Sequence, residues 1–123
     1  MATTNIVDKD GNTIAASDAT VPSDRHFRNA WTLSGKTITE DLAESKKIFQ
    51  DKIREVRTPL LAAEDVVYMK ALEVDDADAK TASVTKKQAL RDAPAASAIA
   101  DATTIAELKA AWDADLLGDS PYA

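Results

Sequence analysis

Apolar residues recur at helical spacing from Leu42 to Leu72. Gaps of three, four and seven residues place them on one face of a helix, because an α-helix turns once in about 3.6 residues. Basic side chains fall mostly on the opposite face, which we expect to be solvated. The apolar set is Leu42, Phe49, Ile53, Val56, Leu60, Ala63, Val67 and Ala71, and the basic set is Lys46, Lys47, Lys52, Arg54 and Arg57.

Pro59 lies in the middle of this stretch. It is compatible with two structures: a new helix that starts at Pro59 with Thr58 as its cap, or one helix with a kink. The apolar pattern runs through Pro59 without a change of phase, which favours the kinked helix. Thr39, followed by Glu40 and Asp41, is the predicted N-terminal cap, because acidic residues stabilise the positive end of a helix.

The N-terminal third predicts two small β-hairpins. Residues 5–14 place Ile6 and Ile14 on either side of a turn at Gly11 and Asn12, where positive φ is expected. Residues 30–38 contain a second candidate, with the turn at Gly35. Between them we expect a polar arm and a short turn near residues 24–29.

Two shorter helices are predicted after the long one. An alanine-rich helix covers residues 77–91, with Asp76 or Asp78 as its cap and Pro94 at its end. Thr104 and Glu107 form a capping box that opens a last helix, which Gly118 ends. The apolar residues of that last helix are Ile105, Leu108, Trp112 and Leu116.

The pattern as a whole predicts a mainly α protein of the α+β type and of elongated shape. Unbroken, the helix over residues 42–72 would be about 46 Å long, more than the diameter of a compact globule of this length. We expect three regions: N-terminal hairpins and a docking arm over residues 1–38, a helical domain over 39–118, and a tail over 119–123.

The composition predicts a thin core. Alanine accounts for 24 of the 123 residues, and Leu, Ile, Val and Phe together for only 25. A chain with so few large apolar side chains gains little from burial, so we expect self-association, with a trimer favoured, or a complex with another protein.

The charge distribution argues against nucleic acid as a partner. Net charge is -6, and the second half of the chain carries most of the excess acid, which repels a phosphate backbone. No apolar run approaches the length of a membrane span, so no membrane insertion is expected. Residues 1–5 have neither a basic nor an apolar region typical of a signal peptide, and we expect synthesis in the cytoplasm. There is no cysteine.

Candidate chemistry is sparse, and we expect no enzyme, no cofactor and no metal. The lone His26 is read as an exposed turn residue, although Arg25 and Arg28 beside it would suit an anion. Glu64 and Asp65 are neighbours on a helix and point about 100° apart, which excludes a catalytic pair. Asp75, Asp76 and Asp78 could hold a divalent cation, but helix capping in a solvated loop is their expected role. The basic set described above fits an acidic partner and a solvated helix surface about equally well.

We predict that the apolar face of the long helix, with two aromatic residues before it, forms a partner interface. On this hypothesis Phe49→Asp or Ile53→Asp abolishes assembly, because it buries an unpaired charge. The predicted interface residues are Phe27, Trp31, Leu42, Phe49, Ile53, Val56, Leu60 and Val67.

Three segments together resemble small proteins of tailed bacteriophages described as tail assembly chaperones or tail-fibre-associated proteins. The segments are residues 21–31, the stretch from Asp51 through Arg57 and Pro59 to Asp65, and residues 86–95, which read KKQALRDAPA. The resemblance, counted from the first segment to the third, extends over about two thirds of the chain, and the third segment is the most specific part.

The resemblance implies a non-enzymatic structural or adaptor component of the tail-fibre or baseplate module. It implies other phage tail proteins as partners and the virion tail as the location. One alternative is a transient tail-fibre assembly chaperone that is absent from the mature virion. A weaker alternative is a metal- or glycan-binding tip module that uses the aspartates and tryptophans. The resemblance implies no catalytic residues.

Overall fold

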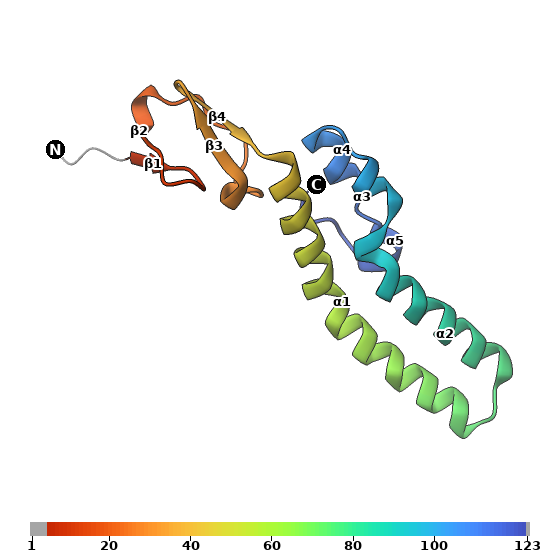
Figure 1. Ribbon diagram of the computed structural model, residues 1–123. Helices are drawn as coiled ribbons and strands as arrows, with labels where there is room; N and C mark the ends of the chain where they lie inside the picture. The colour runs from red at the N-terminus through yellow and green to blue at the C-terminus, as the bar shows by residue number, and fades with distance from the viewer. Residues whose placement is uncertain (1–4, 123) are drawn as a thin grey trace.

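The computed structural model describes residues 5–122. The predictions made for residues 1–4 and for Ala123 lie outside this range. Two β-hairpins lie at one end of an elongated molecule, and a long pair of antiparallel helices extends from the other (Figure 1). Short helices of the C-terminal third pack beside the first half of the long helix. The predicted mainly α, elongated α+β fold is therefore confirmed.

Both predicted hairpins are present. Strand β1 (Asn5–Val7) pairs antiparallel with β2 (Thr13–Ala15), and β3 (Trp31–Ser34) pairs antiparallel with β4 (Thr37–Glu40). Gly11 and Gly35 occupy the turns with φ of 86° and 63°, where a side chain would be strained. Asn12, for which positive φ was also expected, does not adopt it.

The first hairpin is fastened to the second through Asp8. Its carboxylate accepts hydrogen bonds from the backbone N–H groups of Asn12 at 2.8 Å and of Leu33 at 2.9 Å. The arm between the hairpins contains two short 3-10 helices, Ala16–Asp18 and Arg28–Ala30. It also adds a bridge to the second sheet, because Ile38 N donates to Thr20 O at 2.7 Å.

Helix α1 (Leu42–Glu73) begins two residues later than Thr39 capping would place it. Thr39 and Glu40 are instead the last residues of β4, opposite Thr32 and Trp31. Asp41 is the actual N-cap, and its side chain accepts from Glu44 N at 3.2 Å. The prediction of a Thr39 cap was wrong because cross-strand pairing uses that residue first.

Pro59 lies inside α1, which continues through it as one helix. Proline has no N–H to donate to the carbonyl of Glu55, four residues earlier. The axis of α1 changes direction about half-way along its length (Figure 1), which agrees with the predicted kink.

Helix α2 (Ala77–Asp92) runs back along α1 after a tight turn. Asp76 caps it, as predicted, by accepting from Ala79 N at 3.0 Å. Asp75 in the turn has a positive φ of 53°, which an aspartate tolerates better than most residues. A 3-10 turn over Ala93–Ala95 follows α2.

The C-terminal third is more broken than expected. Helix α3 (Ser97–Asp101) was not predicted, and the expected last helix is two helices, α4 (Ile105–Ala110) and α5 (Ala114–Leu117). The predicted Thr104 cap and the Gly118 terminus are both present. Between them, α4 ends at Ala110, and Asp113 caps α5 by accepting from Leu116 N at 3.2 Å.

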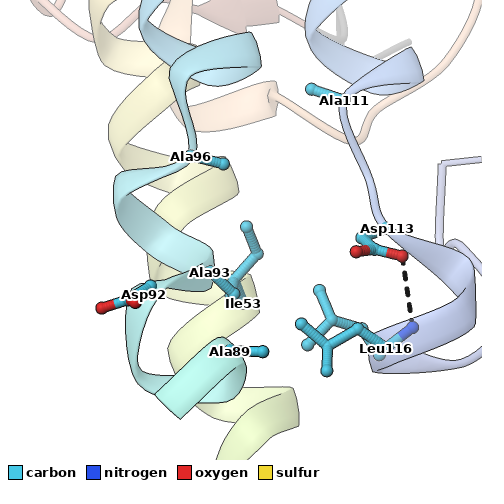
Figure 2. Close-up of a pocket in the computed structure, with 9 residues that line it drawn as sticks. Ile53, Ala89, Asp92, Ala93, Ala96, Ala111, Asp113 and Leu116 are labelled. Carbon is cyan, nitrogen blue, oxygen red and sulfur yellow. Dashed lines mark hydrogen bonds between the residues drawn. The ribbon is translucent and has the colours of Figure 1, made fainter. Parts of the chain in front are cut away.

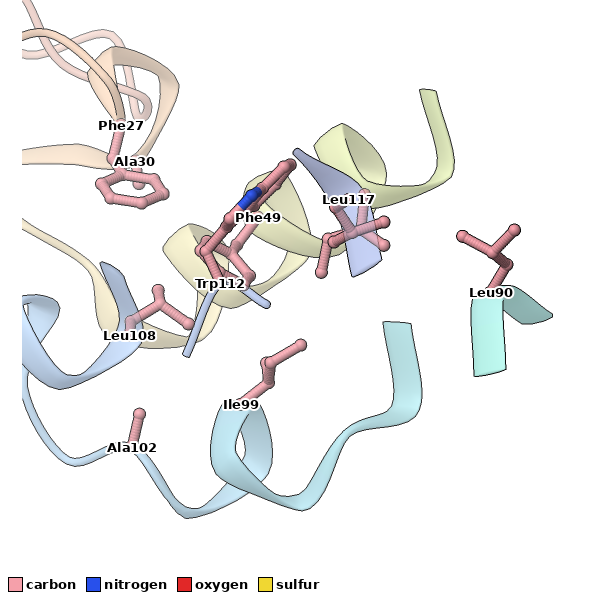
Figure 3. Close-up of a cluster of buried hydrophobic side chains, with 10 residues drawn as sticks. Phe27, Ala30, Phe49, Leu90, Ile99, Ala102, Leu108, Trp112 and Leu117 are labelled. Carbon is pink, nitrogen blue, oxygen red and sulfur yellow. The ribbon is translucent and has the colours of Figure 1, made fainter. Parts of the chain in front are cut away.

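The core lies where the first half of α1 meets the C-terminal helices and the arm before β3. Its buried side chains come from elements that are far apart in the sequence, as Figure 3 shows. They are Phe27, Ala30, Phe49, Ile53, Leu90, Ile99, Ala102, Leu108, Trp112 and Leu117.

Candidate functional site

The predicted interface face of α1 is mostly internal. Phe27 and Phe49 are fully buried, and Trp31 and Ile53 are 2% and 1% exposed. Phe27, Phe49 and Ile53 pack in the main core, which the C-terminal helices complete, so these buried side chains are covered within the chain itself and are not an exposed surface, in contrast to the prediction. Leu42, Val56 and Leu60 are partly buried, and of the predicted set only Val67 is largely exposed, at 47%.

Burial also changes the meaning of the Phe49→Asp experiment. A carboxylate at this position would enter the core of the chain itself, where it would have no partner. The variant would lose assembly by unfolding, and that loss would not identify an interface.

Trp31 was expected to lie on an interface but is covered from within. The guanidinium carbons of Arg28 and Arg25 lie 4.5 Å and 5.8 Å from its ring centroid. These cation–π contacts occupy the arginines that the sequence suggested as an anion site beside His26. His26 itself is exposed and packs edge-on against Tyr122, with centroids 5.1 Å apart.

Tyr122 completes an aromatic cluster that the sequence did not reveal. Its ring stacks on Phe27 and on Phe49 at centroid distances of 5.1 Å and 5.2 Å, and Trp112 meets it nearly edge-on at 6.0 Å. Burial raises the pKa of Tyr122 to about 12. Tyr122 of the predicted tail therefore packs against the core, and no short-range pattern signals this.

The outer half of the α1–α2 pair has a different interior. Its buried residues are Glu64, Ala71 and Ser83, which are small or polar, in contrast to the aromatic and branched residues of the main core. Ser83 Oγ donates to the carbonyl of Glu64 at 3.3 Å, and the Glu64 carboxylate lies 3.6 Å from Lys86 Nζ. Little apolar area holds the two helices together here, so we expect this half of the pair to be the less stable one.

Large apolar side chains in this outer half face solvent instead. Val66, Met69 and Leu72 are spaced by three residues and are 54%, 54% and 47% exposed. Because an α-helix turns about 100° per residue, this spacing keeps the three side chains on one broad face of α1, which we call the distal apolar surface. Val67, Val74 and Val84 are also exposed in this half of the pair.

The clearest pocket lies between α1, α2 and α5 (Figure 2). Its volume is about 240 Å³, and its two acidic side chains already have partners: Asp113 caps α5, and Asp92 accepts from Gln88 Nε2 at 3.0 Å. Because most of the lining side chains are small and apolar, this pocket suits the binding of an apolar side chain better than catalysis. The lining residues are Ile53, Ala89, Asp92, Ala93, Ala96, Ala111, Asp113, Leu116 and Leu117.

A close ion pair joins the arm before β3 to α4. Lys109 Nζ donates to Asp24 Oδ2, and this bond holds the pKa of the Asp24 carboxyl below its usual value. Glu40 lies nearby, and burial raises its pKa, helped by the charge of Asp24. The Asp24–Lys109 pair links segments 85 residues apart, and we assign it a structural role.

The acidic turn after α1 does not form a metal site in this structure. Asp76 caps α2, and the Asp75 carboxylate is 3.0 Å from Lys80 Nζ. Within residues 5–122 no group of three or more histidines, cysteines or acidic residues is arranged to hold a metal ion. Both tryptophans are buried, Trp112 being 7% exposed, so neither offers an open platform to a sugar.

No protein-family model, curated protein or solved structure was found to match this chain. Among the helices of the described part, none is both long enough and apolar enough to cross a membrane.

Proposed function

We propose that this chain is a non-enzymatic bacteriophage tail protein, a structural or adaptor component of the tail-fibre or baseplate module. Two properties of the sequence support the proposal: the resemblance of three of its segments to phage tail-associated proteins, and a content of large apolar residues close to the minimum for folding. The structure adds a candidate contact surface.

The distal apolar surface is the observation that carries this proposal. In the outer half of the α1–α2 pair, alanine, serine and a glutamate face inwards while valine, methionine and leucine face solvent. This distribution is the reverse of that expected for a self-sufficient helical pair. A partner protein that covers Val66, Met69 and Leu72 would bury the missing apolar area and stabilise the projecting helices.

The proposed partners are other tail proteins, either fibre or baseplate subunits, or further copies of this chain in a trimer. The outer half of the α1–α2 pair, which carries this surface, projects from the rest of the elongated molecule (Figure 1). A projecting helical pair reaches a neighbour without disturbing the core, which suits an adaptor.

The alternative is a transient fibre-assembly chaperone that is absent from the finished virion. The chemistry of the distal apolar surface favours this alternative in one respect. Its members are aliphatic or methionine, and the aromatic anchors typical of tight interfaces are not among them. Such a surface suits contacts that are released again.

The test compares purified particles of the phage that carries the gene, analysed by protein gels. We expect the wild-type chain to copurify with particles. The double variant Val66→Ser/Met69→Ser should keep the wild-type circular dichroism and melting temperature but be missing from particles. The control is Val7→Ser/Val21→Ser, which changes two valines that are each 44% exposed and lie outside the helical pair.

Three other outcomes lead elsewhere. Normal incorporation of the Val66/Met69 variant excludes the distal apolar surface as the contact. A chain that binds fibre subunits in infected cells but never appears in particles supports the chaperone. A chain that associates with no tail protein at either stage contradicts both proposals.

A further inference from the structure

Three arginines meet at a surface pocket where α1 passes the end of α2. Arg54 and Arg57 share one face of α1 with Gln50, because the spacing is four and then three residues. Arg91 comes from the last turn of α2, and the 3-10 turn after it supplies Pro94 and Ala95. The pocket has a volume of about 240 Å³ and opens on solvent.

Hydrogen bonds to the backbone hold the walls of this pocket in place. Arg57 Nη1 donates to the carbonyl of Arg91 at 2.8 Å and to that of Leu90 at 3.4 Å. Gln50 Nε2 donates to the carbonyl of Pro94 at 2.8 Å. These bonds satisfy carbonyls at and just after the end of α2. Within residues 5–122, Nη1 is the only nitrogen of the Arg57 guanidinium that donates a hydrogen bond. The other N–H groups of that guanidinium remain available to a ligand.

The positive charge of the pocket exceeds the negative charge around it. Arg54 is 2.7 Å from the carboxylate of Asp51, and this is an exposed pair that water competes for. The Arg91 guanidinium forms no ion pair within the described part of the chain. The nearest acid on α2, Asp92, bonds to Gln88 and lines the separate pocket of Figure 2.

Backbone carbonyls at the end of α2 affect which kind of anion the pocket can bind. The carbonyls of Leu90, Arg91 and Pro94 border the pocket, and the C-terminal end of a helix carries partial negative charge. That field opposes a dianion such as phosphate more than a carboxylate. Planar guanidinium groups also match a carboxylate with two parallel hydrogen bonds.

We propose that this pocket, formed by Arg54, Arg57 and Arg91, binds a carboxylate from an acidic segment of a partner protein. The proposal goes beyond the distal apolar surface, since it uses other residues and requires contact at another part of the molecule. It gives the chain a second, electrostatic contact beside an apolar one.

The test measures binding of a fluorescently labelled, acetylated hexapeptide of alternating aspartate and glutamate by anisotropy at 150 mM NaCl. We expect saturable binding, and Arg54→Gln and Arg91→Gln should each weaken it about tenfold, the usual cost of losing a charge-assisted hydrogen bond. Arg57 is left unchanged because it also caps α2. Lys47→Gln is the matched control, because this lysine lies on the same helix outside the pocket and pairs with Glu44 at 3.2 Å. It should change the affinity less than twofold.

Equal weakening by Lys47→Gln would show attraction to net charge alone and overturn the proposal. Absence of saturable binding would do the same. Inorganic phosphate is the second probe: if phosphate binds at the pocket more tightly than the peptide, the ligand is a small anion and the assignment to a protein segment fails. The Val66→Ser/Met69→Ser variant should bind the peptide normally, which separates this result from that of the proposed function.

Discussion

The carboxylate of Asp8 accepts a hydrogen bond from the backbone N–H of Leu33 at 2.9 Å. Next to it, Lys9 N donates to the carbonyl of Trp31 at 2.9 Å. These two bonds join the first β-hairpin to the second. Since an isolated two-stranded hairpin is at best marginally stable in water, the order of residues 5–15 depends on this junction.

The Asp8 junction predicts a pH dependence of stability. The hydrogen bond from Leu33 N, with those from Asn12, lowers the pKa of Asp8 to about 2 from its ordinary value of 3.8. A carboxylate with a lowered pKa in the folded state stabilises the fold above the unfolded pKa and loses that effect as the pH falls through the folded one. We therefore expect its contribution to be complete above about pH 4 and to vanish towards pH 2. Thermal unfolding followed by tryptophan fluorescence at a series of pH values measures this.

The variant Asp8→Asn isolates this effect. It should melt at a lower temperature than wild type at pH 7, and the difference should shrink as the pH falls from 4 to 2. Asp10→Asn is the control, because among residues 5–122 the exposed Asp10 carboxylate pairs only with Lys9 Nζ, at 3.3 Å. A constant difference between wild type and Asp8→Asn across this range would contradict the role given to Asp8.

The core position of Ile53 predicts a large effect on folding. It is 1% exposed within the main core, and truncation of a buried isoleucine to alanine removes contacts and leaves a cavity. We expect Ile53→Ala to lower the free energy of unfolding by about 2–5 kcal/mol. Val67→Ala, at a site that is 47% exposed, should change it by about 0.5 kcal/mol or less. Urea unfolding followed by circular dichroism compares the two, and equal effects would mean that the face of α1 that contains Ile53 is not internal.

These two residues also show what the sequence could and could not predict. Helical periodicity identified the face of α1 that contains Ile53 and Val67, because the spacing of apolar residues indicates which face of a helix is buried. It could not say what covers each part of that face. Ile53 is buried under helices from the C-terminal third, whereas the described chain leaves Val67 47% exposed, and both sequence contexts look alike.

The pocket of the arginines and the aromatic cluster were beyond such reasoning for a similar reason. Arg57 and the carbonyl of Arg91 are 34 residues apart, and Tyr122 meets Phe27 across most of the chain. Patterns within a few neighbouring residues of the sequence do not indicate such long-range contacts. Caps and turns were predicted better, as at Asp76, Thr104 and Gly35, since their signals are confined to a few neighbouring residues.

Tyr122 gives a third prediction. Because its ring stacks on both Phe27 and Phe49, Tyr122→Ala should lower the free energy of unfolding by about 2 kcal/mol, while Tyr122→Phe should be close to wild type. The raised pKa of about 12 means that the tyrosine stabilises the fold fully below its ordinary value of 10, and that this contribution is lost as the pH rises through 12. Unfolding at pH 8 and at pH 11 measures both effects, and a fully neutral Tyr122→Ala would return the segment 119–122 to the status of a free tail.

The two halves of the α1–α2 pair should differ in local stability. Residues 65–86 enclose only Ala71 and Ser83 as buried side chains, whereas residues 45–60 are held by the main core. We expect backbone amides of the outer half to exchange with solvent on the order of ten times faster than those near Phe49. Hydrogen–deuterium exchange measured by mass spectrometry resolves the two regions. Uniform protection along α1 would mean that the outer half needs no partner to be stable.

The bend at Pro59 turns the outer half of α1 into a lever arm. From residue 60 to residue 73 the helix is about 21 Å long, so a change of about 20° at the bend moves its end by about 7 Å. Substitution of the proline would thus shift the positions of Val66 and Met69 while leaving both side chains intact. The direction in which the proposed contact surface points and its apolar character therefore depend on different residues, so that one can change without the other.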